Sequence, residues 1–333
     1  MTQSIVELRN LTVELPIRGE YHEVLRGINL QLESGEALGL VGESGSGKSM
    51  TAKTIGRLLP STAQVRGEVS VLGRDLWSLQ GAALRQHRTE VAMVFQDPRA
   101  HINPVRTIGD FMTEALRTLK RVDQRTARSM AVDALVELAV SEPERRLHQY
   151  PHELSGGLLQ RVLIATMLLM KPKLLLADEI STALDVTTQA DLIAILDKLR
   201  RKRGMSMLFI THDLDLAAAI CDRTAVMYAG QVIEAQASAR LHSDPWHPYT
   251  AALSAARPPL EEDVVRLNAV PGRPLSAFEA PKGCSFAPRC RFATDDCTSG
   301  PVPLTEIDEH ISVRCIRARE LHQTDALKGG TYV

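Results

Sequence analysis

A glycine-rich octapeptide early in the chain has the spacing of a phosphate-binding loop. It reads GESGSGKS, from Gly42 to Ser49, and fits the pattern G-x-x-x-x-G-K-[ST]. Its glycines let the backbone curl until successive N–H groups converge on phosphate oxygens. Lys48 can then reach the β- and γ-phosphates, and the Ser49 hydroxyl can bind Mg²⁺. A chance glycine-rich turn is the weaker alternative, because the motif lies between an expected buried strand and an expected helix.

Asp178 and Glu179 are a second group of residues that could do chemistry. They close the stretch LLLADE, so a buried strand should present Asp178 at its carboxyl end. There Asp178 can hold Mg²⁺ through water, and Glu179 can polarise a water that attacks the γ-phosphate. A carboxylate pair capping a helix is the alternative, but it would leave the match to the phosphate loop unexplained.

The stretch LSGGLLQR, from Leu154 to Arg161, predicts a second and weaker anion site. Ser155, Gly156 and Gly157 begin a helix with a small hydroxyl and two bare backbone units, and helix N-termini attract anions. A chain with a complete phosphate loop hardly needs this site for its own nucleotide. We therefore expect it to close on a nucleotide held by a partner chain.

The apolar pattern predicts the elements that position these groups. Alternation within 5–33 indicates antiparallel strands, and the unbroken apolar run 37–41 indicates a buried parallel strand that leads into the phosphate loop. Helical periodicity dominates from 99 to about 150, with Asp123 as an N-cap. Proline becomes frequent after 245, which predicts a boundary near 256 and a small, loop-rich C-terminal unit. Further buried strands are expected at 91–95, 174–178 and 205–210, and another helix at 187–203.

Composition narrows the class of protein. A chain of 333 residues suggests one large domain with an appendage, or two domains. Lys and Arg number 39 against 40 Asp and Glu, a balance that argues against a nucleic-acid binder. The longest apolar run, 162–170, is too short to cross a membrane, and no secretory signal is visible. We expect a cytosolic protein, in which structural disulfides are improbable.

The order of these motifs resembles the ATP-binding cassette (ABC) family of transporter ATPases over roughly residues 5–255. The resemblance implies an α/β fold, a P-loop NTPase cassette with a RecA-like core, an antiparallel β subdomain and an inserted helical subdomain at about 97–160. It places Gln96 of VFQDP at the Q-loop, which touches Mg²⁺ and the transmembrane partner. It places Asp185 of STALD at the D-loop and His212 of ITHDL at the switch histidine that contacts the γ-phosphate.

The resemblance also implies how the site works. Two cassettes clamp two ATP molecules head to tail, Glu179 orients water, and Lys48, His212 and Mg²⁺ stabilise the transferring phosphoryl group. Ser49, Gln96 and Asp178 are the expected Mg²⁺ ligands. Tyr21 is the candidate for stacking on adenine. The residues expected to bind ATP are Tyr21, Gly42, Ser44, Gly45, Ser46, Gly47, Lys48, Ser49, Met50 and Gln96.

Three stretches resemble the ATP-binding subunits of oligopeptide, dipeptide and nickel importers: FQDP…NPVRTIGD, ADEISTALDVTTQA and HSDPWHPYT. This resemblance implies a nucleotide-binding domain at 1–255 and a peptide-importer-type extension at 256–333. Two residues depart from the branch pattern: Leu158 in the signature, and Ile180 where proline is usual.

The same resemblance implies the partners. They are a second, different ABC ATPase, two permease subunits and an extracytoplasmic solute-binding protein, with the chain peripheral on the cytoplasmic face of the inner membrane and no nucleic acid. Peptides are the favoured solute, and nickel, a metal chelate or another solute is the alternative. A soluble ABC ATPase acting on nucleic acid or ribosomes is less favoured, and so is an exporter ATPase, which would lack the cysteine-rich tail.

Four of the five cysteines lie in that tail, at Cys284, Cys290, Cys297 and Cys315. Their spacing lacks the close pairs that are usual in structural zinc sites. Four thiolates from loops could hold an iron–sulfur cluster, and some members of the resembled branch are thought to carry a four-iron cluster there. Four reduced thiols without a metal are an equally open reading, and zinc is less favoured. Cys221 is expected to be a small buried residue in a helix.

Overall fold

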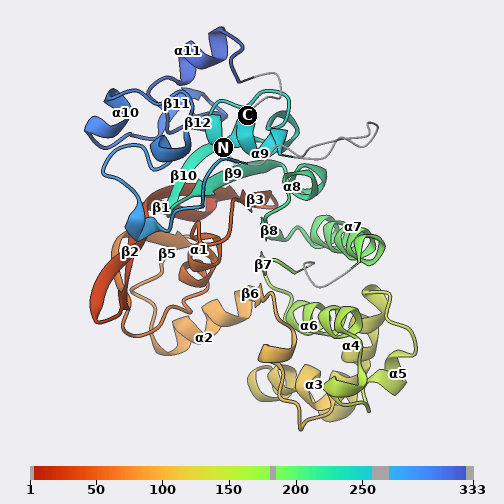
Figure 1. The fold of residues 1–333 in the computed structure, drawn as a ribbon. Coiled ribbons are helices and arrows are strands. Elements are labelled where there is room, and N and C mark those ends of the chain that lie inside the picture. Colours follow the sequence, from red (N-terminus) through yellow and green to blue (C-terminus); the bar gives the residue numbers. More distant parts are fainter. Residues whose placement is uncertain (1–3, 181–184, 257–269, 328–333) are drawn as a thin grey trace. The chain divides into compact units, whose positions relative to one another are not determined.

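The computed structural model describes residues 4–180, 185–256 and 270–327. These residues form two compact units, which Figure 1 draws in chain colours. Residues 4–77 and 209–327 make the first unit, and residues 78–208 make the second. The strand β8 (Ser206–Thr211) spans the point at which the chain passes from the second unit back to the first.

An antiparallel sheet with the order β2-β1-β4-β5 lies in the first unit. Its two long strands alternate as predicted, and Leu8 and Leu11 of one strand lie opposite Leu30 and Ile28 of the other. All four of these side chains are buried. This is expected for the face of an antiparallel sheet that packs on the core. The strands are β1 (Ser4–Ile17), β2 (Glu20–Glu33), β4 (Gln64–Val71) and β5 (Arg74–Asp75).

A second set of strands in the first unit has the order β11-β12-β10-β9-β3. The strand β3 pairs in parallel with β9, and all five of its residues are buried, as the unbroken apolar run predicts. Residues after 270 extend this sheet, because β12 pairs with β10. The strands are β3 (Ala37–Val41), β9 (Arg223–Tyr228), β10 (Gln231–Ala237), β11 (Thr305–Asp308) and β12 (Ile311–Val313).

Short helices surround these strands, and aromatic rings tie the C-terminal residues to them. The rings of Tyr228, Tyr249 and Phe286 pack with centroids 4.8 to 5.4 Å apart in one buried cluster. Residues 284–290 therefore share the core of the sheet. The α-helices are α1 (Lys48–Ile55), α8 (Leu214–Ile220), α9 (Pro248–Ala255), α10 (Asp296–Ser299) and α11 (Ala318–Gln323). The 3-10 turns are η3 (Ser238–Arg240), η4 (Ala277–Glu279) and η5 (Ala287–Arg289).

In the second unit, β6 (Val91–Val94) pairs in parallel with β7 (Leu174–Asp178). The helices α3, α4 and α6 pack against one another. Asp123 caps α4 as predicted, since its Oδ1 accepts a 3.0 Å hydrogen bond from the Thr126 amide. The helices are α2 (Gly81–Glu90), α3 (Ile108–Leu119), α4 (Gln124–Glu137), α5 (Pro143–Arg146), α6 (Gly156–Leu169) and α7 (Val186–Arg203), with 3-10 turns η1 (Arg99–His101) and η2 (Pro151–Glu153).

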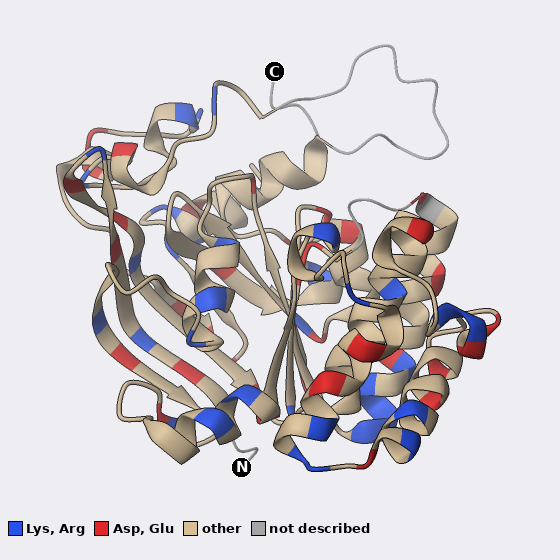
Figure 2. Cartoon of the chain, turned by 90° about the horizontal axis from the view of Figure 1, so that it is seen from below, with Lys and Arg blue, Asp and Glu red and all other residues tan. Residues whose placement is uncertain are grey.

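Charged residues of both signs are mixed along the helices and strands that Figure 2 shows. This pattern agrees with the formal net charge of −1. Across the described ranges, no helix is both long enough and apolar enough to span a membrane.

A buried carboxylate holds the segment that leads into α9. Glu234 of β10 accepts hydrogen bonds from the backbone amides of Trp246 and His247, at 2.9 and 2.8 Å, and from the Gln236 side chain at 2.9 Å. Burial raises the pKa of Glu234 to about 7, and the hydrogen bonds that it accepts work in the opposite direction. The protonated form is therefore more favoured in the folded protein than in the unfolded chain.

Glu234→Gln tests this linkage. Since the pKa of Glu234 rises from 4.5 to about 7 on folding, its protonation stabilises the fold below pH 4.5, and this contribution is lost as the pH rises to 7. Urea unfolding at several pH values should show the wild type losing stability relative to the variant across this window, by roughly 1.4 kcal/mol for each unit of pKa difference. The exposed Glu68→Gln variant is the control. Parallel stability profiles for wild type and Glu234→Gln would contradict the assignment.

Candidate nucleotide-binding site

The glycine-rich loop joins β3 to α1, as the sequence predicts. Gly47 adopts a left-handed conformation, with φ of 105°, and N-caps α1. A Cβ atom at Gly42 would lie 2.1 Å from the carbonyl oxygen of Met227, and one at Gly47 would lie 2.7 Å from a Leu25 methyl group. Only glycine fits at both positions, because neighbouring strands approach the loop so closely.

Lys48 is folded over this loop and is 4% exposed. Its Nζ donates hydrogen bonds to the carbonyl oxygens of Gly42, at 2.7 Å, and Glu43, at 3.0 Å. Ser49 follows it in the first turn of α1 and is half-buried. The ammonium group thus lies at the mouth of the loop, from where it can turn toward a phosphate.

Two more predicted residues belong to the first unit. His212 directly follows β8 and is exposed, and Asp213 beside it caps α8 by accepting from the Asp215 and Leu216 amides. Tyr21 lies in β2 and is 48% exposed. Its stacking on adenine stays a prediction.

The second unit brings two predicted residues into direct contact. Gln96 and Glu179 come just after the parallel strands β6 and β7, whose carboxyl ends lie side by side. The Gln96 Nε2 donates a 3.0 Å hydrogen bond to the Glu179 Oε2. Asp178, the last residue of β7, is 5% exposed. The strand pairing therefore places an amide and two carboxylates together, which are groups suited to holding Mg²⁺ and orienting water.

Helix N-termini carry the other predicted groups of the second unit. Ser155 N-caps α6, where its Oγ accepts a 3.4 Å hydrogen bond from the Leu158 amide. Gly156 follows, and a Cβ there would meet no heavy atom within 4 Å, so space remains above this helix start. Gly157 is half-buried in the same turn. The arrangement agrees with an anion site.

The two departures from the branch pattern and the D-loop also lie in this unit. Ile180, where proline is usual in the resembled branch, is 2% exposed, so its side chain packs in the interior. Leu158 is half-buried. Asp185 N-caps α7, and the Thr188 hydrogen bonds hold the pKa of the Asp185 carboxyl below its usual value. The preceding D-loop residues, 181–184, lie outside the described residues.

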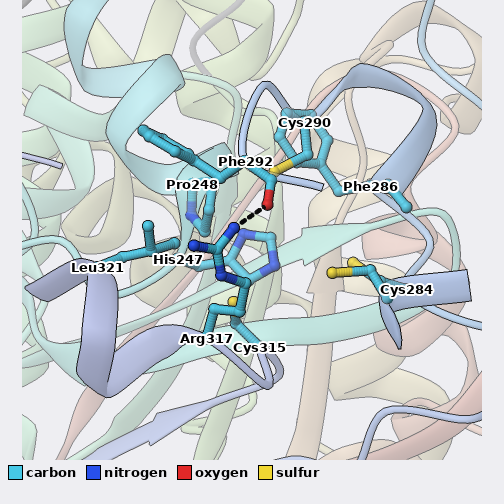
Figure 3. Close-up of a pocket in the computed structure, with 11 residues that line it drawn as sticks. His247, Pro248, Cys284, Phe286, Cys290, Phe292, Cys315, Arg317 and Leu321 are labelled. Carbon is cyan, nitrogen blue, oxygen red and sulfur yellow. Dashed lines mark hydrogen bonds between the residues drawn. The ribbon is translucent and has the colours of Figure 1, made fainter. Parts of the chain in front are cut away.

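The four tail cysteines all line one pocket, which Figure 3 shows in close-up. They come from separate segments and form no disulfides. The Cys284 amide donates a 2.7 Å hydrogen bond to the Cys297 carbonyl oxygen, which brings two of the segments together. The remaining lining is mostly apolar or aromatic: His247, Pro248, Phe286, Ala287, Phe292, Arg317 and Leu321. Cys221 is apart from them, buried and one residue beyond α8.

The protonation and the arrangement of these thiols bear on whether the pocket could hold a metal ion or a cluster. Burial raises the pKa of the Cys284 thiol. It also raises the pKa of Cys290 to about 11 and the pKa of Cys315 to about 12. Neighbouring cysteines raise these pKa values further. Within the described parts of the chain, no three His, Cys, Asp or Glu side chains are arranged to hold a metal ion. All four cysteines line this pocket, but in the described residues they are not grouped around a single ion position. Thiolate sulfur is a ligand of both iron–sulfur clusters and zinc, so the donor set alone suits either group.

Sequence reasoning missed one cluster of residues at the phosphate loop. Tyr249, from the HPYT stretch, and Arg289, from the stretch GCSFAPRC, both form hydrogen bonds to Glu43 in the phosphate loop. The first stretch belongs to a segment that resembles the importer branch, and the second lies in the cysteine-rich tail. Their long separation from Glu43, 206 and 246 residues, gave no local signal that they would meet it.

Comparisons with known proteins agree with this geometry. Residues 25–182 match the ABC transporter family, and residues 233–297 match the oligopeptide/dipeptide transporter C-terminal region. The oligopeptide transport ATP-binding protein OppD of Haemophilus influenzae is 41% identical over 89% of this chain and 92% of its own length. A putative peptide import ATP-binding protein of Brucella abortus is 42% identical over 94% of this chain and 95% of its own length.

Among solved structures, a dimeric post-hydrolysis state of the ATP-binding cassette MJ0796 with ADP and phosphate is similar. It has a TM-score of 0.64 and 29% identity, and the match covers 70% of this chain and 98% of that one. The fold, the motif order and these relatives lead to one conclusion. The chain belongs to the ABC transporter family, as an ATP-binding subunit of the oligopeptide, dipeptide and nickel importer branch.

Proposed function

We propose that this chain hydrolyses ATP to power the import of peptides through a membrane permease. The observation that carries the ATPase part is the contact between Gln96 and Glu179 at the ends of β6 and β7. Gln96 would bind Mg²⁺ and Glu179 would activate water, so this contact would couple the two steps. The choice of peptides rests on relatives that are named for oligopeptide transport and peptide import.

The residues divide the chemistry of hydrolysis among them. Lys48 and the loop amides hold the phosphates, and Ser49, Gln96 and Asp178 are the groups that would hold Mg²⁺. That ion, when bound, supplies charge neutralisation on the phosphate oxygens. Glu179 orients the attacking water by accepting its hydrogen bond. His212, an exposed residue beyond β8, would contact the γ-phosphate.

A second cassette would complete each nucleotide site. Ser155, Gly156 and Gly157 would bind the γ-phosphate of ATP held by the partner cassette, and Asp185 would contact that partner at the interface. We infer that the partner is a different ABC ATPase, and that two permease subunits and an extracytoplasmic solute-binding protein complete the importer. The chain would be peripheral on the cytoplasmic face of the inner membrane, with residues 1–255 as its nucleotide-binding domain and 256–333 as its extension.

Glu179→Gln should separate binding from turnover. The amide keeps the size of the side chain but accepts hydrogen bonds less strongly than a carboxylate, so ATP should still bind while steady-state hydrolysis falls by about a hundredfold or more. ATP binding and phosphate release by the purified complex measure the two effects. Glu68→Gln, at an exposed site on β4, is the matched control. Unchanged hydrolysis in Glu179→Gln would remove Glu179 from the role of base, or place the activity in the partner's site.

Affinity purification of the tagged chain from membranes should recover two permease subunits and a second ATPase. Retention of peptides by the associated solute-binding protein would support peptide import. Retention of nickel or a metal chelate instead would move the chain to the nickel-type alternative. Recovery of ribosomes or nucleic acid without permeases would contradict an importer.

We also propose that the four tail cysteines hold a four-iron cluster, because all four line one mostly apolar pocket. Anaerobically purified protein should be brown, with about four irons per chain and sulfur-to-iron absorbance, since each thiolate binds one iron. Cys290→Ser should lose the colour, and Cys221→Ser, outside the pocket, should keep it. Stoichiometric zinc without iron, or four free thiols without any metal, would contradict the cluster.

A further inference from the structure

Glu43, the second residue of the phosphate-binding loop, forms an ion pair with the C-terminal part of the chain. The Arg289 Nη1 lies 2.6 Å from the Glu43 Oε2, and the Arg289 Nη2 lies 3.2 Å from the Oε1. A two-point contact of this kind fixes the orientation of the carboxylate as well as its position. The Arg289 side chain is 4% exposed and that of Glu43 is 22% exposed, so water screens the pair only weakly.

Tyr249 contacts the same residue at two further points. Its hydroxyl accepts a 3.0 Å hydrogen bond from the Glu43 amide and donates a 3.3 Å hydrogen bond to the Glu43 Oε2. Burial raises the pKa of Tyr249, so the phenol keeps the proton that it donates. One hydroxyl therefore holds both the main chain and the side chain of Glu43.

Arg289 is itself held in a fixed direction. Its Nε donates to the carbonyl oxygen of Pro271 at 2.6 Å, and its Nη2 donates to that of Val270 at 3.3 Å. Its Nη1 also lies 3.4 Å from the Tyr228 hydroxyl. Arg289 ends the turn η5 and directly precedes Cys290, one of the thiols of the cysteine pocket. We call residues 270–327 the cysteine lobe.

Within the loop, Glu43 is also the residue on which Lys48 rests. The Glu43 carbonyl oxygen accepts from the Lys48 ammonium at 3.0 Å and from the Ser46 amide at 3.2 Å. A shift of Glu43 would therefore move both the ammonium and an amide that would meet the phosphates. Glu43 therefore links the four contacts from Arg289 and Tyr249 to the two contacts from Lys48 and Ser46 within the loop.

We propose that Arg289 is a positioning residue for the phosphate-binding loop, and that the Arg289–Glu43–Tyr249 network makes the cysteine lobe a working part of the ATP site. This role goes beyond powering import. It gives the C-terminal extension the task of holding the phosphate-binding loop in place whenever this chain binds a nucleotide. Two stretches at 242–250 and 283–290, far apart in the sequence, meet at one residue of the loop to perform it.

Arg289→Met in the full chain, assembled with its partner subunits, tests the proposal. Losing a charge-assisted contact to a partly buried carboxylate should weaken Mg²⁺–ATP binding by at least about tenfold. KM for ATP should rise, and kcat at saturating ATP should change much less, because the phosphates themselves can reorder the loop. Arg273→Met is the matched control, since Arg273 forms a similar two-point pair with Glu279 in the same lobe and at an exposed site.

Hydrogen exchange on the nucleotide-free full chain gives a readout that does not depend on activity. Amides of residues 43–49 should exchange faster in Arg289→Met and at the wild-type rate in Arg273→Met. Arg289→Lys, which keeps the charge but has one donor nitrogen, should recover part of the ATP affinity. Tyr249→Phe removes both hydroxyl contacts without leaving a charge unpaired, and should weaken ATP binding by about threefold.

In a double-mutant cycle, the effects of Arg289→Met and Tyr249→Phe on ATP affinity should be non-additive, because both residues contact the Glu43 carboxylate. If Arg289→Met does not fold, Tyr249→Phe alone carries the test by the same two readouts. Wild-type exchange in the loop together with wild-type ATP affinity would overturn the proposal. Equal defects in Arg289→Met and Arg273→Met would also overturn it, since they would indicate general weakening of the lobe.

Discussion

The chemistry of this chain depends on strands that are buried along their whole length and end at polar groups. Parallel pairing brings such ends together, because neighbouring strands that run in the same direction finish at the same edge. In the first unit β3 ends at the phosphate loop. In the second unit β6 and β7 end near Gln96 and Asp178. The buried apolar strands thus fix the positions of the polar side chains at their carboxyl ends.

Much of this arrangement can be predicted from short stretches of sequence. Unbroken apolar runs identify β3 and β7, and Asp123 marks the start of α4 because N-capping depends on one side chain. The positions of Lys48 and Glu179 within their motifs follow for the same reason. Each of these features is encoded within about ten residues.

Contacts between distant stretches could not be predicted in this way. The pairing of β10 with β12, the carboxylate of Glu234 beneath the start of α9, and the approach of Arg289 to Glu43 all join segments that carry no shared pattern. The four cysteines are an intermediate case. Their crowding in the tail indicates a common site, but the sequence does not show which apolar and aromatic residues complete the pocket that they line.

The shared aromatic cluster of Tyr228, Tyr249 and Phe286 has a consequence for attempts to isolate the catalytic part of this chain. A fragment cut near residue 256 would keep Tyr228 and Tyr249 but would lose the Phe286 ring that packs against both. It would also expose the edge of β10, where β12 now pairs. Such an edge is prone to pair with other chains. A cut at the boundary where the motifs of the cassette stop should therefore destabilise the part that remains.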